Sequence, residues 1–431
     1  MQFDCSNPKT DDRSESREAR FTPELQVIEN HGADHLEQLR AAIDRGLRTR
    51  RFLGYYESRA WAIRAAPVVH AIASASAAPS AELVLLIERA VGRVVRVIFQ
   101  ADDSDGMIGD LARELLGLHA QVCEAGVADP KKLARWMVRF CFDDQDFFEL
   151  DPVRYAGALG EPGLASYRGE VQQRREADDD SFAARYATER LAVLDGDVGA
   201  IVVLLGGDLS RPYDFIRVAE AMEELGRDDD VLAWAERGIA ETDGWQVAQL
   251  YDLAVGVHCR RQDQDAMLEL RRAQHHRMPS ATSYDLLRQV AEQVGIWQHE
   301  CAKARSVLAA HDLGGLVDVL LAAKEYDAAW GVATSTSDWD AGDRRWMRLA
   351  EARESTHPWD ALEVYLRLAD QELETTGRAA YTRATRILKR AARAAVRADR
   401  TAEFGDHLQL LRDRYRRRPT LLAMLDKPGW R

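Results

Sequence analysis

Apolar and small residues recur at helical spacing along most of this chain. Val231, Trp234, Ala235, Gly238 and Ile239 stand at positions i, i+3, i+4, i+7 and i+8, so they share one face of a helix. Two further stripes have related spacing, namely Ala361, Val364, Tyr365, Leu368 and Ala369, and the shorter set Ala266, Leu270 and Ala273. Strand-like alternation is rare. The pattern therefore predicts an all-α protein.

The first half of the chain carries the same signal without a clear period. The Val- and Ile-rich run 91–99 has the composition of a strand, but the segments on both sides have helical spacing, which favours a buried helix. Asp129-Pro130 is a favourable helix start. In the polar turn 102–106 we expect Ser104 or Asp105 to cap the next helix. The predicted helices cover about 34–50, 57–75, 80–101, 107–125, 130–142, 151–156, 161–175, 180–194 and 197–205.

The second half contains five short motifs that each join two predicted helices. They span 226–231, 261–266, 296–301, 324–329 and 356–361, and their last residues are 35, 35, 28 and 32 positions apart. Tetratricopeptide-type helix pairs repeat every roughly 34 residues. We therefore expect a helical-repeat array, an α-solenoid, after an N-terminal helical domain. The expected divisions are a poorly ordered tail at 1–33, a helical domain at 34–175, a connecting helical pair at 176–212 and the repeats at 213–431.

Charge and cysteine content narrow the class of protein. The net charge is −13, which disfavours general binding to phosphate backbones. Residues 378–418 nevertheless hold 13 Lys or Arg against 4 Asp or Glu, so the rest of the chain carries −22. The five cysteines are dispersed, which is typical of reduced thiols and indicates a cytoplasmic protein. No apolar run reaches the roughly 18 residues of a membrane span, and the N-terminal residues lack a signal-peptide core.

Many dispersed segments resemble one family. The chain is similar to the helical C-terminal region of bacterial SWIM zinc-finger proteins and to related bacterial helical proteins, through residues 51–55, 61–62, 101–106, 115–119, 129–135, 155–167, 208–213, 226–238, 357–365, 416–419 and 422–425. The resemblance implies an intracellular bacterial protein beside nucleic-acid machinery such as helicases. The SWIM module needs a Cys-x-Cys and a Cys-x-His pair to close a tetrahedral zinc site, and this sequence has neither. Zinc and DNA binding are therefore not transferred.

Candidate chemistry is sparse. Asp102, Asp103 and Asp105 precede Gly106, but a calcium loop counted from that glycine would have alanine at two ligand positions, so we expect a turn with capping. His258-Cys259 and His275-His276 are neighbours on helices and point about 100° apart, so neither pair chelates a metal by itself. No phosphate-binding loop, dinucleotide fingerprint or nucleophile elbow occurs. We expect no catalytic residue, no cofactor and no metal.

Two functions remain open. The first is an interaction scaffold whose acidic body binds a protein partner with a basic segment. The alternative is a nucleic-acid-associated protein that uses Arg-rich C-terminal helices. A solvated helix face is the more common interpretation of such a basic stretch. The candidate interaction residues are Arg383, Arg386, Lys389, Arg390, Arg393, Arg416, Arg417 and Arg418, together with the acidic loop Asp102, Asp103 and Asp105.

Overall fold

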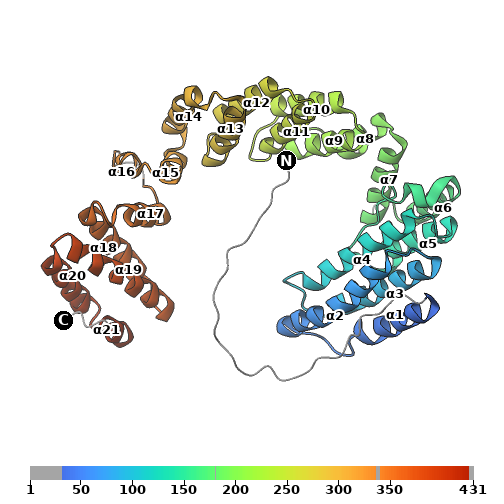
Figure 1. The fold of residues 1–431 in the computed structure, drawn as a ribbon, viewed down its shortest axis with the longest axis horizontal. Helices are drawn as coiled ribbons and strands as arrows, with labels where there is room; N and C mark the ends of the chain where they lie inside the picture. Colours follow the sequence, from blue (N-terminus) through green and yellow to red (C-terminus); the bar gives the residue numbers. More distant parts are fainter. Residues whose placement is uncertain (1–31, 180, 336–339, 427–431) are drawn as a thin grey trace. The chain divides into compact units, whose positions relative to one another are not determined.

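The structure is a computed structural model that describes residues 32–179, 181–335 and 340–426. In these residues it contains twenty-one α-helices, one π-helical turn and no β-strand (Figure 1). The predicted all-α fold class is confirmed. None of the described helices is long and apolar enough to cross a membrane. Residues 1–31 of the predicted tail lie outside the described part of the chain.

The chain divides into two compact units, Met1–Ala200 and Ile201–Arg431. This boundary falls inside the segment 176–212, which we expected to connect the helical domain to the repeats. The helices of unit 1 are α1 (Gly32–Gly46), α2 (Tyr55–Ala75), α3 (Ala81–Ile98), α4 (Met107–Glu124), α5 (Pro130–Arg139), α6 (Ala156–Ala177) and α7 (Phe182–Asp195), and α8 (Val198–Gly206) crosses the boundary.

Local sequence explains where the helices of unit 1 begin. Ser80, Asp129 and Ser181 each accept a hydrogen bond from a backbone N–H in the first turn of α3, α5 and α7. The run 91–99 belongs to α3 and its C-terminal cap, and its residues Val91, Val94, Val95 and Val97 are buried, so the helix interpretation is correct.

The expected helix at 151–156 is wrong. Residues 152–155 form a turn, and α6 begins at Ala156. The carboxylate of Asp151 accepts from the N–H of Val153 at 3.0 Å, which favours a turn over a continuing helix. Within α6, Gly160 has φ 51° and interrupts the helix, so its regular part starts close to the predicted residue 161. The helix expected at 130–142 ends at Arg139, and a π-helical turn, Phe140–Asp144, follows it.

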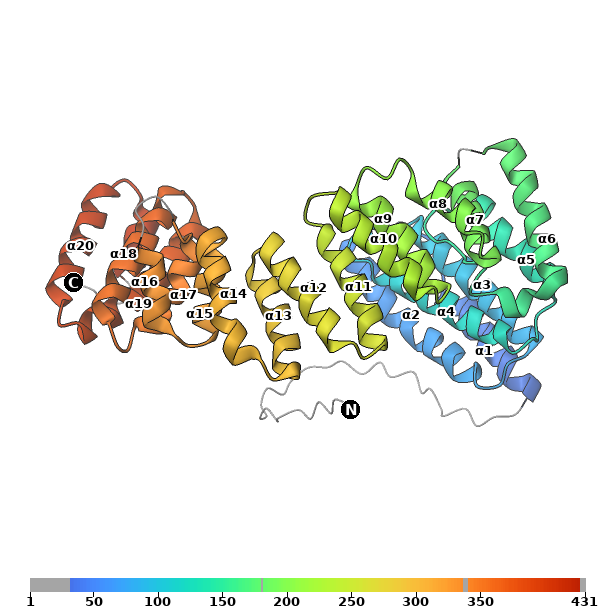
Figure 2. The same cartoon turned by 90° about the horizontal axis from the view of Figure 1, so that it is seen from above.

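Unit 2 consists of helices in antiparallel pairs, which follow one another in chain order from α11 to α15 in Figure 2. Their bounds are α9 (Pro212–Glu224), α10 (Asp228–Glu241), α11 (Val247–Arg260), α12 (Gln264–Arg277), α13 (Ala281–Val294), α14 (Trp297–His311), α15 (Leu313–Ala322), α16 (Tyr326–Thr334), α17 (Asp343–Arg353), α18 (Pro358–Glu374), α19 (Arg378–Arg397), α20 (Thr401–Arg414) and α21 (Pro419–Asp426). Each of the five predicted motifs lies at the turn from an odd-numbered helix to the next even-numbered one. The helical-repeat prediction is confirmed.

Packing in unit 2 joins helices that are one or two positions apart in the chain. The odd-numbered helices also contact each other in the pairs α9–α11, α13–α15, α15–α17 and α19–α21, whereas among the even-numbered helices α12 and α14 form such a pair. The odd-numbered row is therefore the more closely packed of the two.

Two of the three predicted apolar stripes are correct. Val231, Ala235 and Gly238 are buried on α10, with Trp234 and Ile239 partly buried, and all five residues of the α18 stripe are buried. A Cβ atom on Gly238 would lie 2.7 Å from Cβ of Phe215 and 2.8 Å from Cδ1 of Leu250. Glycine therefore permits the close approach of α9, α10 and α11.

The stripe predicted for α12 is wrong, because Ala273 is exposed and the buried face is shifted. That face includes Arg271, Gln274 and His275. The imidazole of His275 contacts the hydroxyl of Ser283 and the carbonyl of Ala304, both at 2.9 Å. An apolar pattern cannot reveal a face whose buried members are polar and hydrogen-bonded.

Ion pairs connect successive helix pairs of unit 2 at their turns. Arg261 pairs with Asp229 at 2.7 Å, and Arg305 pairs with Glu325 at 2.7 Å. Both contacts join one of the five turn motifs to the neighbouring helix pair. The turns therefore hold the stack together as well as reversing the chain.

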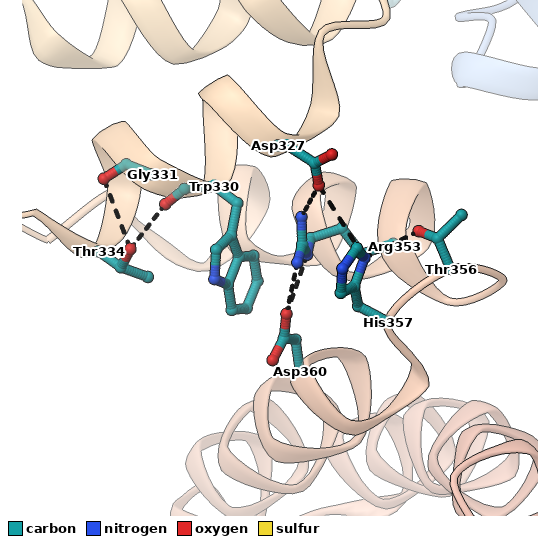
Figure 3. Close-up of polar contacts among 8 residues, drawn as sticks. All are labelled: Asp327, Trp330, Gly331, Thr334, Arg353, Thr356, His357 and Asp360. Carbon is teal, nitrogen blue, oxygen red and sulfur yellow. Dashed lines mark hydrogen bonds and ion pairs between the residues drawn. The ribbon is translucent and has the colours of Figure 1, made fainter.

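Arg353 forms the most buried of these connections (Figure 3). It is 6% exposed, donates to the carboxylate of Asp360 at 2.8 and 3.0 Å and pairs with Asp327. Its guanidinium carbon also lies 5.0 Å from the ring centroid of Trp330. One side chain of α17 thus contacts both α16 and α18.

Candidate functional site

Aspartates recur at the repeat period on three successive odd-numbered helices. Asp252, Asp285 and Asp318 lie in the second turn of α11, α13 and α15, and each is 33 residues from the next. α13 packs against α15, and the repeat period places Asp252 at the equivalent position of α11. We call these three residues the aspartate row. It lies on the odd-numbered helices, the more closely packed side of unit 2.

Each member of the aspartate row has an arginine partner but keeps access to solvent. Asp252 pairs with Arg271 at 2.6 Å, and Asp285 pairs with Arg288 at 3.3 Å. Asp318 accepts from Arg345 at 2.9 Å and also pairs with Arg348. The side chains of Asp252 and Asp285 are each 55% exposed, and that of Asp318 is 24% exposed. The Asp285–Arg288 pair is exposed on both sides and contributes at most about 1 kcal/mol, so an incoming cation can compete for Asp285.

A pocket of about 410 Å³ lies between α13, α14 and α15 and includes two members of the row. Asp285 and Asp318 line it together with Tyr284, Trp297, Arg288 and Arg305. This volume is within the range of ligand-binding pockets, roughly 300–1,000 Å³. We call it the row pocket.

The buried side of the row pocket is held by aromatic and hydrogen-bonding contacts. Tyr284 is 3% exposed, and its ring meets that of Trp297 edge-on with centroids 5.1 Å apart. Burial and a hydrogen bond with the thiol of Cys301 raise the pKa of Tyr284 to about 12, so its hydroxyl keeps its proton at neutral pH. The Nε–H of Arg305 donates to that hydroxyl at 3.4 Å, while its terminal nitrogens bind Glu325. The pocket therefore offers rigid aromatic surface beside carboxylates and guanidinium groups.

The predicted basic residues lie at the C-terminal end of unit 2, and neighbouring acids pair with most of those on α19. Arg383 pairs with Glu372, Arg390 with Glu351 and Arg393 with Glu354. Arg386 and Lys389 are exposed and form no ion pair within the described residues. The acidic partners lie on α17 and α18, outside the segment whose charge suggested a basic surface.

The three consecutive arginines 416–418 differ in exposure and in their contacts. Arg416 and Arg417 are exposed in the turn after α20. Arg418 donates to the carbonyl of Leu373 at 2.7 Å, and its guanidinium carbon lies 4.4 Å from the ring centroid of Tyr415. Arg418 therefore has a structural role at the C-terminal end of α18.

The acidic loop in unit 1 caps a helix, although Asp103 provides the main contacts where we expected Ser104 or Asp105. The carboxylate of Asp103 accepts from the N–H groups of Ile108 and Gly109 at 2.9 and 2.8 Å, at the start of α4. Asp105 accepts from the N–H of Met107 at a longer 3.3 Å. Asp102 accepts from the hydroxyl of Ser104 at 2.8 Å. The loop is far from the aspartate row in sequence and belongs to unit 1.

Comparisons with known proteins do not identify a family or a function for this chain. No family model and no curated protein matches the sequence. Among solved structures, the chain is similar to one described as the human IFIT1 dimer with m7Gppp-AAAA, with 12% identity over 91% of this chain and 96% of that chain and a TM-score of 0.24. A similarity of this size indicates nothing about function, and the repeat architecture follows from the helix packing described above. The resemblance to SWIM-associated helical regions stays a prediction.

Sequence reasoning missed the aspartate row. The 33-residue spacing was available as a signal, but the motifs that we followed mark the turns instead of the odd-numbered helices. The row pocket depends on Tyr284, Trp297 and Arg305, which come from two helices and acquire a common role when α13 packs against α14. No spacing rule predicts that juxtaposition.

Proposed function

We propose that this protein is a helical-repeat scaffold that binds a basic, extended segment of a protein partner along the odd-numbered helices of unit 2. The aspartate row and its pocket are the observation that carries the proposal. Extended segments commonly bind to pockets through side chains, and repeat arrays present long surfaces to them. The Trp297 ring would provide apolar contact area, while the carboxylates would select Lys and Arg.

The charge of unit 2 supports a basic partner. Residues 201–377 contain 18 Lys or Arg and 32 Asp or Glu, so the array ahead of α19 has a strong negative excess. Such a field attracts basic segments, and the attraction falls with rising salt. An acidic partner or a nucleic acid would be repelled by the same residues.

Nucleic-acid binding through the C-terminal helices has weaker support. The ion pairs of α19 neutralise Arg383, Arg390 and Arg393. Arg418 has a structural contact. The basic excess of the segment 378–418 therefore does not reach solvent as one continuous surface.

The proposal can be tested with a random peptide library displayed on phage and selected on the full-length protein. We expect the enriched peptides to be rich in Lys and Arg and to bind less tightly as salt rises. The variant Asp285→Asn should weaken a selected peptide by about five-fold, corresponding to about 1 kcal/mol.

Asp265→Asn is the matched control. Asp265 is exposed on α12, lies outside the aspartate row and forms no ion pair among the described residues. It should leave affinity unchanged. Enrichment of neutral or acidic peptides, or equal binding by Asp285→Asn and the control, would contradict the proposal.

A further inference from the structure

Unit 1 contains a larger cavity that is independent of the aspartate row. Its volume is about 600 Å³, and it lies where the π-helical turn, the following loop, α6 and α7 meet. Five aromatic side chains line it, namely Phe142, Phe148, Tyr167, Phe182 and Tyr186. We call it the aromatic cavity. A volume of this size suits a small molecule or a single long side chain.

Gln145 fixes the loop that forms one wall of the aromatic cavity. It is 5% exposed, and its amide nitrogen donates to the carbonyls of Phe140 and Phe148 at 3.1 and 2.7 Å. Its amide oxygen accepts from the N–H groups of Phe147 and Phe148 at 2.6 and 2.7 Å. One buried side chain thus satisfies four backbone groups. The wall is preformed, which lowers the entropic cost of binding.

A π-helical turn forms part of the same wall. Such turns are rare and occur frequently at functional sites. Here the turn positions Cys141, whose sulfur accepts a hydrogen bond from the N–H of Leu150 at 3.3 Å. Burial raises the pKa of Cys141 to about 12, so the thiol is neutral and unreactive at physiological pH. Cys141 therefore does not supply a thiolate nucleophile to the cavity.

Polar groups in the aromatic cavity lack protein partners. Tyr167 is 3% exposed and lines the cavity, yet its hydroxyl forms no hydrogen bond with any described residue. The hydroxyl of Tyr186 is likewise without such a partner. Both groups are free to bond to a ligand or to water in the cavity.

The charged side chains among the described residues that line the aromatic cavity are both acidic. Asp146 and Glu149 line it, and both are exposed and form no ion pair with other described residues. No Lys or Arg is among the described residues that line the cavity. The nearby arginines are occupied, since Arg174 binds Asp143 and Arg190 binds Asp151, each at 2.7 Å. Burial first, and then the negative charges of Asp151 and Glu149, raise the pKa of Tyr186.

We propose that the aromatic cavity binds a small organic cation, an alkylated ammonium or a guanidinium group. The faces of aromatic rings attract cations, and a desolvated contact of this kind contributes appreciably to affinity. The rings of Tyr186 and Phe182 lie nearly parallel, at 19° with centroids 6.4 Å apart. Together with the carboxylates of Asp146 and Glu149, they provide the two features that select a cation over a neutral molecule of the same shape.

The test is isothermal titration calorimetry of the full-length protein with choline, with N-methylguanidine and with 3,3-dimethylbutan-1-ol, which is the neutral isostere of choline. We expect at least one cation to bind, and the alcohol to bind at least about 10-fold more weakly than choline if choline is the ligand. Measurable binding of choline and the alcohol with equal affinity, or no binding of either cation up to about 10 mM, would overturn the proposal.

Two sets of variants distinguish the contribution of the carboxylates to cation binding from the contribution of the aromatic ring of Phe182. Asp146→Asn with Glu149→Gln should weaken cation binding about five-fold without changing the far-ultraviolet circular dichroism, because both side chains are exposed. Phe182 is 62% exposed, so Phe182→Ala should also fold and should lose affinity through the missing ring. Glu161→Gln, an exposed change on α6 outside the cavity lining, is the control and should bind like the unmodified protein.

The source of the cation can be distinguished with an arginine-containing tripeptide. Tighter binding of the peptide than of N-methylguanidine would identify a protein side chain as the ligand, and tighter binding of the small cation would identify a free molecule. Both results support the proposal.

Discussion

Replacing Gly238 by alanine tests whether close helix packing, rather than helix propensity, controls the start of the repeat array. The added Cβ would lie 2.7 Å from Cβ of Phe215 and 2.8 Å from Cδ1 of Leu250. Carbon atoms pack best at about 3.5–4.0 Å. Since Phe215 is fully buried, it has little room to move, and α10 must shift by roughly 1 Å away from α9 or α11.

The expected cost combines two opposing effects. Overpacking of this kind destabilises by about 1–3 kcal/mol, while the greater helix propensity of alanine returns about 0.5–1 kcal/mol. We expect net destabilisation of about 1–2 kcal/mol. Gly331→Ala in α16 is the matched control, because no atom outside the local helix backbone lies within 4 Å of its added Cβ. It should stabilise by up to about 1 kcal/mol.

Urea denaturation followed by circular dichroism measures both variants. The midpoint should fall for Gly238→Ala and should stay equal or rise for Gly331→Ala, with comparison of whole curves because a repeat array need not unfold in two states. If Gly238→Ala proved as stable as Gly331→Ala, propensity would dominate and the close approach of α9, α10 and α11 would not be tightly constrained.

Two further predictions concern buried polar residues of unit 2. Arg353→Met should lower the free energy of unfolding by about 2 kcal/mol, because it removes charged hydrogen bonds to Asp360 and the contact with Asp327. Arg344→Met, on the exposed side of α17, should change this free energy by less than about 0.5 kcal/mol. Equal effects of the two substitutions in urea denaturation would show that the buried network contributes nothing specific. Burial lowers the pKa of His275 below its ordinary 6.5, so the unfolded chain takes up the proton first and stability should fall as pH drops below about 6.5, by at most about 1.4 kcal/mol per pH unit. Urea midpoints measured between about pH 7 and pH 5 should be less pH-dependent for His275→Gln than for the unmodified protein, and parallel profiles would refute the assignment.

The repeat architecture was predictable because the turn motifs are local signals. Residues such as Val231 and Ala361 mark the start of a buried face immediately after a tight turn, and both are fully buried. Element boundaries failed where local hydrogen bonds competed with the helix, as at Asp151. The α12 stripe failed because His275 and Arg271 are buried through polar contacts that only the folded neighbours provide.

The candidate sites were less predictable than the fold. The sequence shows the basic excess of the C-terminal segment. It does not show that part of this charge is neutralised by residues outside the segment, namely Glu351, Glu354 and Glu372. The aromatic cavity brings together side chains from three separate stretches of unit 1, and its two free tyrosine hydroxyls become notable only once their neighbours are known. Charge totals describe a segment, whereas binding depends on which charges remain unpaired after folding.

The described helices of unit 2 pack mainly against helices that are one or two positions away in the chain, so each junction between helix pairs can bend separately. A small change of angle at each junction adds along the stack, so the distance between Asp252 and Asp318 can vary more than the geometry of any single helix pair. The turn contacts, such as Arg261 with Asp229, then set the stiffness of each junction. Ionic strength would therefore tune the compliance of the binding surface as well as its attraction for a basic segment.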